Sequence, residues 1–97
     1  MQFLVEIQIT LPPDMDGDGR ASLLAAELAR GQELVAAGAI VAIWRIPGGL
    51  RNVGVWEAAD ATELHELISS LPLFRWLSAD VTALADHPLA AALKLIR

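Results

Sequence analysis

Glu27 is the residue of this chain whose type and position best suit catalysis. At about 100° per residue, the helix expected around it gathers one apolar stripe. The stripe consists of Leu23, Leu24, Leu28, Gly31, Leu34, Val35 and Gly38. Glu27 falls within this stripe, whereas Glu33 points to the opposite side together with Gln32. Burial disfavours the charged form of a carboxyl group and raises its pKa, so Glu27 could act as a general acid or base near neutral pH. The pattern alone favours the alternative, a structural ion pair between Glu27 and Arg45 or Arg51.

Two polar side chains beside a predicted hairpin could bind a substrate. Arg45 follows Trp44 at the end of an apolar strand and could hold a carboxylate through two hydrogen bonds. A pairing of Arg45 with Glu27 or Glu57 fits the pattern equally well. Asn52 lies on the returning strand and could donate to a carbonyl or enolate oxygen, although such residues usually bond to backbone or water.

Other candidate groups carry weaker signals. Four aromatic residues could line an apolar pocket or anchor the core and an interface: Trp44, Trp56, Trp76 and Phe74. His65 and His87 have no apparent partners for a catalytic triad, and no serine has the sequence context of a nucleophile elbow. Covalent catalysis is therefore not expected.

The acidic segment 14–19 matches the opening of a calcium-binding loop, DMDGDG. Such a loop needs a bidentate glutamate at its twelfth position, which here is Ala25, and a helix before it, where this chain has a strand and two prolines. We therefore predict turn and N-cap residues here and no metal site.

Composition limits the class of protein. With 97 residues, the chain is expected to form one domain, 1–97. Its hydrophobic fraction of 55% is high for such a small domain, so a partner subunit is expected to cover apolar surface. The longest apolar run, residues 34–44, is shorter than the ~20 residues that span a bilayer. No signal peptide is visible at the N-terminus, so the expected location is cytoplasmic.

Charge and cysteine usage exclude further functions. The chain has no cysteine, which rules out disulfides, thiolate metal sites and a cysteine nucleophile. Its net charge is −5 and its seven basic residues are scattered, so neither nucleic-acid nor membrane binding is expected.

The pattern of elements predicts an α+β fold. Alternation over 2–10 indicates a half-buried strand, and a helix of about five turns follows the acidic segment and ends at Gly38. Residues 40–46, apolar on both faces, suit a central strand, and 50–57 returns as its hairpin partner. A capping box at Asp60 opens a second helix that Pro72 ends, and 78–84 is the last strand.

This βαββαβ order is ferredoxin-like, with a four-stranded antiparallel sheet and two helices on one face. The open face of the sheet is expected to pack against another chain. The apolar, helix-prone tail 89–96 is expected to dock on a neighbouring subunit.

Several short motifs occur in a characteristic order along nearly the whole chain. They are Leu11-Pro12, Asp14-Met15-Asp16, Glu27, Trp44-Arg45-Ile46 with Gly48, Asn52 with Val55, Leu64-His65, Leu71-Pro72-Leu73-Phe74 and His87-Pro88. In this order and spacing the chain resembles the muconolactone Δ-isomerases.

The resemblance implies a homo-oligomer, in this family a decamer. It also implies isomerisation of muconolactone to the 3-oxoadipate enol-lactone, without a cofactor, in the catechol branch of the β-ketoadipate pathway. Glu27 would carry the proton between two ring carbons, as a base poised near the working pH. Arg45 would hold the acetate arm or polarise the lactone, and Asn52 would steady the dienolate oxygen.

The chain departs from the family pattern at the hairpin. The family has His and Tyr after the first glycine, whereas this chain has Gly49 and Leu50, followed by Arg51, which could replace part of the lost polar contacts. The altered turn supports one alternative, a lactone dehalogenase or cofactor-free oxygenase on the same scaffold. Another alternative is a non-catalytic oligomeric protein that binds small molecules, in which Glu27 is only salt-bridged.

Overall fold

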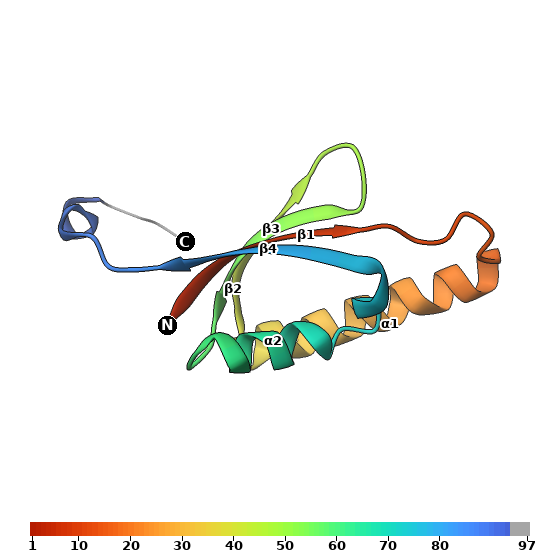
Figure 1. The fold of residues 1–97 in the computed structure, drawn as a ribbon, viewed down its shortest axis with the longest axis horizontal. Coiled ribbons are helices and arrows are strands. Elements are labelled where there is room, and N and C mark those ends of the chain that lie inside the picture. Colours follow the sequence, from red (N-terminus) through yellow and green to blue (C-terminus); the bar gives the residue numbers. More distant parts are fainter. Residues whose placement is uncertain (94–97) are drawn as a thin grey trace.

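A computed structural model describes residues 1–93 of the chain (Figure 1). Its elements in chain order are β1 (Gln2–Ile9), α1 (Gly17–Ala36), β2 (Ile40–Ile46), β3 (Arg51–Glu57), α2 (Ala61–Ser69), the 3₁₀ helix η1 (Phe74–Trp76), β4 (Leu77–Leu84) and the 3₁₀ helix η2 (Pro88–Ala92). The ferredoxin-like βαββαβ fold predicted from the sequence is confirmed.

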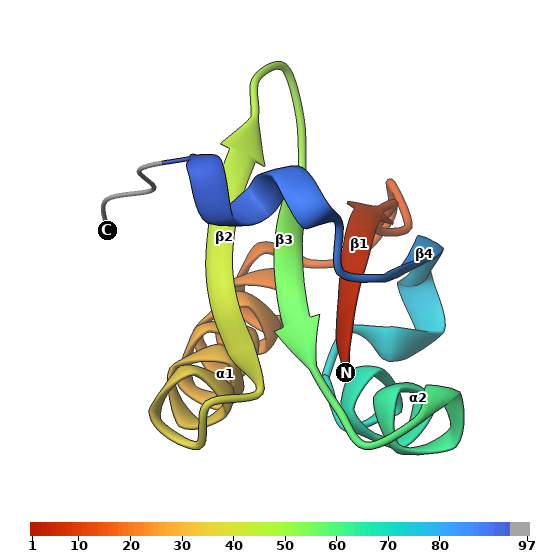
Figure 2. The same cartoon turned by 90° about the vertical axis from the view of Figure 1, so that its left-hand side faces the viewer.

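The four strands form one antiparallel sheet in the order β2-β3-β1-β4. Both helices lie on the same face of this sheet (Figures 1 and 2). The alternation in β1 sends every second side chain, Phe3, Val5 and Ile7, towards the helices, where all three are buried. They pack with Trp56, Leu34 and the apolar face of α2, so the core lies between the sheet and the two helices.

The prediction of a central strand at 40–46 is wrong, because β2 lies at an edge of the sheet and pairs with β3 alone. The apolar residues on the two faces of β2 do not reflect burial on both sides within this subunit. Ile43 faces α1, while Trp44 points to the face without helices, and both remain exposed. Apolar surface is thus left on both sides of this edge.

Side-chain caps fix where the helices begin. Asp16 accepts a hydrogen bond from the backbone N of Gly19 at 2.9 Å, as expected for an N-cap in the acidic segment. Asp60 accepts from the backbone N of Glu63 at 2.8 Å, which confirms the first half of the predicted capping box. Glu63 reaches back to the backbone N of Ala59, one residue earlier than in the standard box.

Gly54 lies at the point where β3 approaches β2 most closely. The pairing of the two strands shifts register between Ile40 and Ala42, and a Cβ atom on Gly54 would lie 2.6 Å from the carbonyl oxygen of Ala42. Glycine is therefore required here by lack of space.

The C-terminal segment extends away from the rest of the molecule. After β4 the chain continues into η2, beyond the end of the sheet and away from both helices (Figure 1). The Cα radius of gyration is 14.9 Å, above the roughly 13 Å of a compact chain of ~100 residues. Leu89 and Leu93 are 66% and 60% exposed. The rest of the predicted tail, 94–96, lies outside the described residues. Within residues 1–93, no helix combines the length and the apolar character that a bilayer span requires.

Candidate active site

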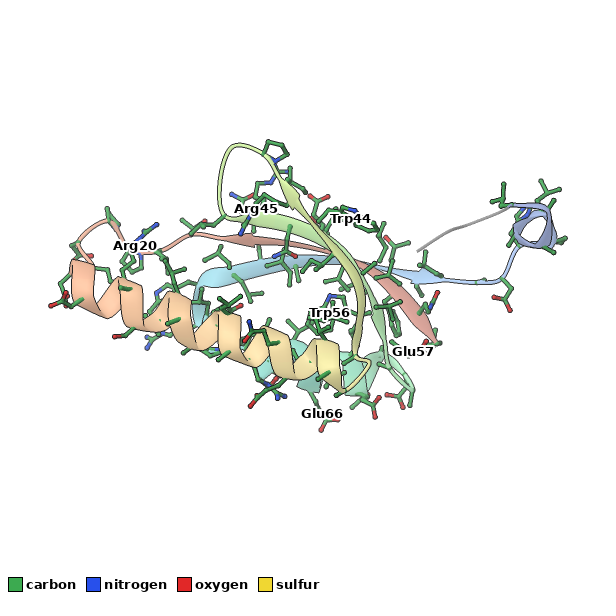
Figure 3. All side chains as sticks on the ribbon, turned by 180° about the vertical axis from the view of Figure 1, so that it is seen from behind. Arg20, Trp44, Arg45, Trp56, Glu57 and Glu66 are labelled. Atoms are coloured by element: carbon green, nitrogen blue, oxygen red, sulfur yellow. The ribbon has the colours of Figure 1, made fainter. Side chains whose placement is uncertain are left out.

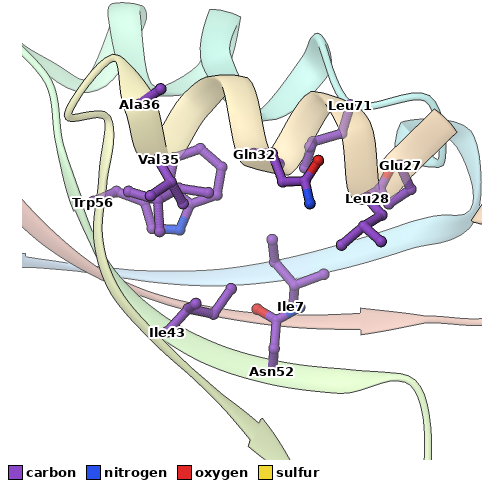
Figure 4. A pocket seen from close by; sticks show the side chains of 12 residues that line it. Ile7, Glu27, Leu28, Gln32, Val35, Ala36, Ile43, Asn52, Trp56 and Leu71 are labelled. Carbon is purple, nitrogen blue, oxygen red and sulfur yellow. The ribbon is translucent and has the colours of Figure 1, made fainter. Parts of the chain in front are cut away.

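A cavity of about 440 Å³ lies between α1 and the sheet, on the side of β2 (Figure 4). Leu28 and Val35 line it from α1, and Ile7 and Ile43 line it from the sheet. Among these apolar walls lie four polar side chains: Glu27, Gln32, Asn52 and Trp56. An apolar cavity of this size with a few polar groups suits a small organic ligand.

Glu27 enters the cavity from α1 and is partly buried. Its Oε1 accepts a hydrogen bond from the backbone N of Leu73 at 3.0 Å, in the connector after α2. Burial raises the pKa of Glu27 above 4.5, and the hydrogen bond from Leu73 opposes this shift only in part. Glu27 can therefore take up and release a proton nearer to neutral pH than an exposed glutamate can.

The ion pair considered for Glu27 does not form. Within residues 1–93 the salt bridges are Met1–Glu57, Arg30–Glu33 and Arg51–Glu6, none of which includes Glu27. The partner of Glu27 is an uncharged amide, which does not hold the carboxylate permanently ionised as an arginine would. This arrangement suits a group that must exist in both protonation states.

The two arginines near the hairpin lie on opposite faces of the sheet. Arg45 is directly opposite Asn52 in the β2–β3 register, so both side chains start on the cavity face. Arg45 is exposed, and its Nη1 donates to the carbonyl oxygen of Arg51 at 3.3 Å, outside the cavity lining (Figure 3). Arg51 itself reaches Glu6 at 3.5 Å on the open face. Arg45 is thus the arginine with access to the mouth of the cavity.

Asn52 and Trp56 bring polar atoms into the cavity from β3. Asn52 Oδ1 and Trp56 Nε1 are both buried and have no hydrogen-bond partner within the described part of the chain. Leaving a buried polar group without a partner costs about 1–3 kcal/mol, so such groups are rare in a stable protein. Since both atoms belong to residues that line the cavity, a ligand or a water molecule there could supply the missing partner.

The other two predicted binding residues lie elsewhere. Trp44 is 58% exposed and points away from the helices, on the opposite side of the sheet from Trp56 (Figure 3). Phe74 packs edge to face against His65, with ring centroids 6.0 Å apart, beside a separate groove between α2 and β4. The roles predicted for Trp44 and Phe74 stay predictions, and neither residue lines the cavity around Glu27.

Sequence reasoning misplaced Gln32, which was expected to face away from Glu27 but lines the cavity (Figure 4). The reason is that the cavity opens at the flank of α1 towards β2, rather than under the centre of the apolar stripe. On this flank Leu28, Val35 and Ile43 are 65%, 54% and 46% exposed. The mouth of the cavity is therefore apolar and open.

Comparison with known proteins identifies the family of this chain. The family model described as "Muconolactone delta-isomerase" matches residues 1–90. Muconolactone Delta-isomerase 2 of Acinetobacter lwoffii is 38% identical over 87 residues, which cover 90% of this chain and 91% of that protein. Muconolactone Delta-isomerase of Rhodococcus opacus is 35% identical, covering 88% and 91%.

Two solved structures have the same fold as this chain. A crystal structure of muconolactone isomerase superimposes with a TM-score of 0.84 at 34% identity, covering 91% of this chain and 92% of that one. The 5-chloro-2-hydroxyhydroquinone dehydrochlorinase of Burkholderia phenoliruptrix superimposes with a TM-score of 0.67 at 19% identity, covering 90% and 96%, and shares the fold. The chain belongs to the muconolactone Δ-isomerase family.

Proposed function

We propose that this protein isomerises muconolactone to the 3-oxoadipate enol-lactone, with Glu27 as the group that moves the proton. The observation that carries the proposal is a carboxyl group of raised pKa inside an apolar cavity of ligand size, held by a neutral amide. Membership of the family supports the choice of substrate.

The reaction needs one group that is first a base and then an acid. The Glu27 carboxylate takes the proton from the ring carbon that bears the acetate arm, and the electron pair of that C–H bond forms the new ring double bond. The original double bond shifts, and negative charge collects on the lactone carbonyl oxygen. The protonated Glu27 then returns the proton to the ring carbon next to the carbonyl, which restores the carboxylate. Proton and electrons balance without a redox partner.

The acetate arm of the substrate carries a negative charge and needs a cation at the mouth of the cavity. Arg45 starts on the cavity face opposite Asn52, and its present hydrogen bond, 3.3 Å to a carbonyl oxygen, is long. A side chain that is exposed and weakly held can turn to a carboxylate at little cost. Arg45 would therefore bind the acetate arm, while the ring enters the apolar space beneath α1.

Ultraviolet absorbance of muconolactone incubated with the protein follows the movement of the double bond and tests this proposal. We expect turnover by the wild type and a loss of about a thousandfold or more in kcat for Glu27→Gln, since no other acidic or basic side chain of residues 1–93 lines the cavity. Glu33→Gln is the matched control, because Glu33 lies on the same helix and pairs with Arg30 at the surface. Wild-type protein without turnover at high concentration would contradict the proposed function.

We further propose that the chain acts as a homo-oligomer in which a second copy covers the apolar surface that one subunit leaves open. Seven of the exposed apolar residues form three groups: the mouth of the cavity with Leu28, Val35 and Ile43, the open sheet face with Leu4 and Trp44, and the extended C-terminal segment with Leu89 and Leu93. Apolar area of this extent is typical of a subunit interface. The decamer expected from the resemblance and the docking of the tail on a neighbour belong to this proposal.

Sedimentation equilibrium of the wild type and of Trp44→Lys tests the assembly. A charged side chain in the centre of a buried interface lacks a partner, so we expect a lower molecular mass for the variant. Glu66→Lys, at an exposed position on α2, serves as the control. A monomeric wild type would contradict the proposed assembly and leave the chemistry at Glu27 to be judged by turnover alone.

The alternatives named from the sequence gain no support from the site. The dehydrochlorinase that shares the fold is too distant in sequence to indicate its chemistry. A binding protein with a salt-bridged Glu27 is disfavoured because the carboxylate meets an amide instead. A cytoplasmic location stays a prediction.

A further inference from the structure

The indole N–H of Trp56 is a buried polar group of the cavity that the proposed proton transfer does not use. Trp56 is 1% exposed and lines the cavity, and its Nε1 has no partner among residues 1–93. An indole N–H can only donate a hydrogen bond and its hydrogen atom has a fixed position, so Nε1 cannot gain a partner by reorienting that atom. The side chain is too large and too deeply packed to turn towards solvent. A ligand or a water molecule in the cavity can bring an acceptor atom to this position.

The acceptor that suits Trp56 is an uncharged oxygen. No arginine, lysine or histidine of the described chain lines the cavity, so a carboxylate placed beside Trp56 would be buried without a cation. A carbonyl oxygen needs only a neutral donor in an apolar setting. The cation available to the substrate, Arg45, starts beside Asn52, four residues from Trp56 along β3, or about 13 Å by the rise of a strand.

We propose that Trp56 Nε1 donates a hydrogen bond to the lactone carbonyl oxygen and stabilises the negative charge that this oxygen gains in the dienolate. This inference rests on the proposed function and names a residue of the same site. It transfers the role predicted for Asn52 to Trp56 and leaves the Asn52 amide for the ring oxygen or the acetate arm.

The arrangement of the cavity fixes how the substrate would lie. Trp56 and Glu27 stand at opposite ends, with Ile7, Asn52 and Gln32 along the space between them (Figure 4). A lactone whose carbonyl meets Trp56 presents the remaining ring carbons towards Glu27. The acetate arm then points to the mouth of the cavity and to Arg45.

Trp56→Phe keeps an aromatic ring and deletes the donor. Because the bond strengthens as charge develops, we expect kcat to fall roughly tenfold to a hundredfold, at or just below the usual loss for one oxyanion donor. KM should change by less than about threefold, since the neutral carbonyl of the ground state binds the donor weakly. The control is Trp76→Phe, a tryptophan outside the cavity that stacks on Arg75 at 5.0 Å. A folded Trp56→Phe protein with unchanged kcat overturns the inference.

A second measurement uses the wild-type protein and does not depend on turnover or on the folding of the variant. The probe is the saturated lactone with the same acetate arm, which has no ring double bond to move. The three tryptophans give three indole N–H signals in a ¹H–¹⁵N spectrum, and Trp44→Phe and Trp76→Phe assign that of Trp56 by elimination.

We expect the Trp56 signal to move downfield on saturation with the saturated lactone, while the Trp76 signal stays in place. Saturation measured by calorimetry without a shift of the Trp56 signal overturns the inference, and so does a failure of the saturated lactone to bind. Both results can be obtained whether or not muconolactone is turned over. Failure of the inference is thus distinguishable from failure of the proposed function.

Discussion

The two helices lie on the same face of the sheet but use their apolar residues differently. α2 has nine residues and buries Leu64 and Ile68 against the sheet. α1 has twenty residues, and Leu34 is its buried one, while Leu28 and Val35 stay exposed at the mouth of the cavity. A helix that only stabilises the fold hides its apolar face, whereas one that forms a site leaves part of that face for a ligand or a partner.

The largest expected effect is a difference in stability between two truncations to alanine, one in each helix. Ile68→Ala removes a side chain that is 5% exposed and should lower the free energy of unfolding by about 2–4 kcal/mol. Leu28→Ala removes one that is 65% exposed and should cost less than ~0.5 kcal/mol in the subunit while raising KM. Urea unfolding of each variant, at a fixed protein concentration, gives both values. Equal losses would show that α1 contributes to the core as much as α2 does.

A smaller effect on stability is expected from removing the N-cap side chain of each helix. Asp60→Ala deletes the N-cap of the short, well-packed α2 and should cost about 1 kcal/mol. Asp16→Ala deletes the corresponding contact in α1, whose first turn is exposed, so that turn should fray locally at a cost below ~0.5 kcal/mol to global stability. Amide hydrogen exchange locates the fraying, and thermal unfolding measures the global cost. A larger global loss for Asp16→Ala would contradict the comparison.

The smallest effect is a pH dependence of stability that is linked to Glu27 in α1. The folded pKa of Glu27 lies above its unfolded value of 4.5, so the folded protein holds this proton more tightly. The stability linked to Glu27 is therefore full below pH 4.5 and is lost as the pH rises through the folded pKa. Glu27→Gln should remove this loss, and the variant should gain stability over the wild type above that window. Parallel pH profiles of the wild type and Glu27→Gln would show that the pKa is not raised.

Local sequence patterns were sufficient for the fold class and the order of the elements, but not for the position of β2 in the sheet. The alternation in β1, the capping aspartates and the turn at Gly48, where φ is 104°, are local signals, and each appears in the structure. The position of β2 in the sheet was predicted wrongly. A strand that is apolar on both faces has the same sequence pattern whether its own subunit covers it or a ligand and a partner do. An edge strand and a central strand differ in the number of strands that pair with them, and this number depends on the tertiary structure.

The sequence predicted some features of the site and missed others. The helical pattern placed Glu27 inward correctly, since helical periodicity depends on a few neighbouring residues. It placed Gln32 at the surface, where it is exposed, but did not predict that Gln32 lines the cavity, because the cavity opens to one flank of α1 and the flank depends on where β2 lies. Burial of the Trp56 N–H without a partner has no counterpart in the sequence, since hydrogen bonding is decided by what surrounds the ring.

The hydrogen bond from Leu73 N to Glu27 limits which sequence changes the connector after α2 can tolerate. Every residue except proline carries the donor, so an apolar residue of similar size in place of the buried Leu73 leaves the contact in place. What must be kept is the path of the main chain from the end of α2 to η1. Insertions or deletions in this connector, more than replacements, are the changes that would move the amide away from Glu27.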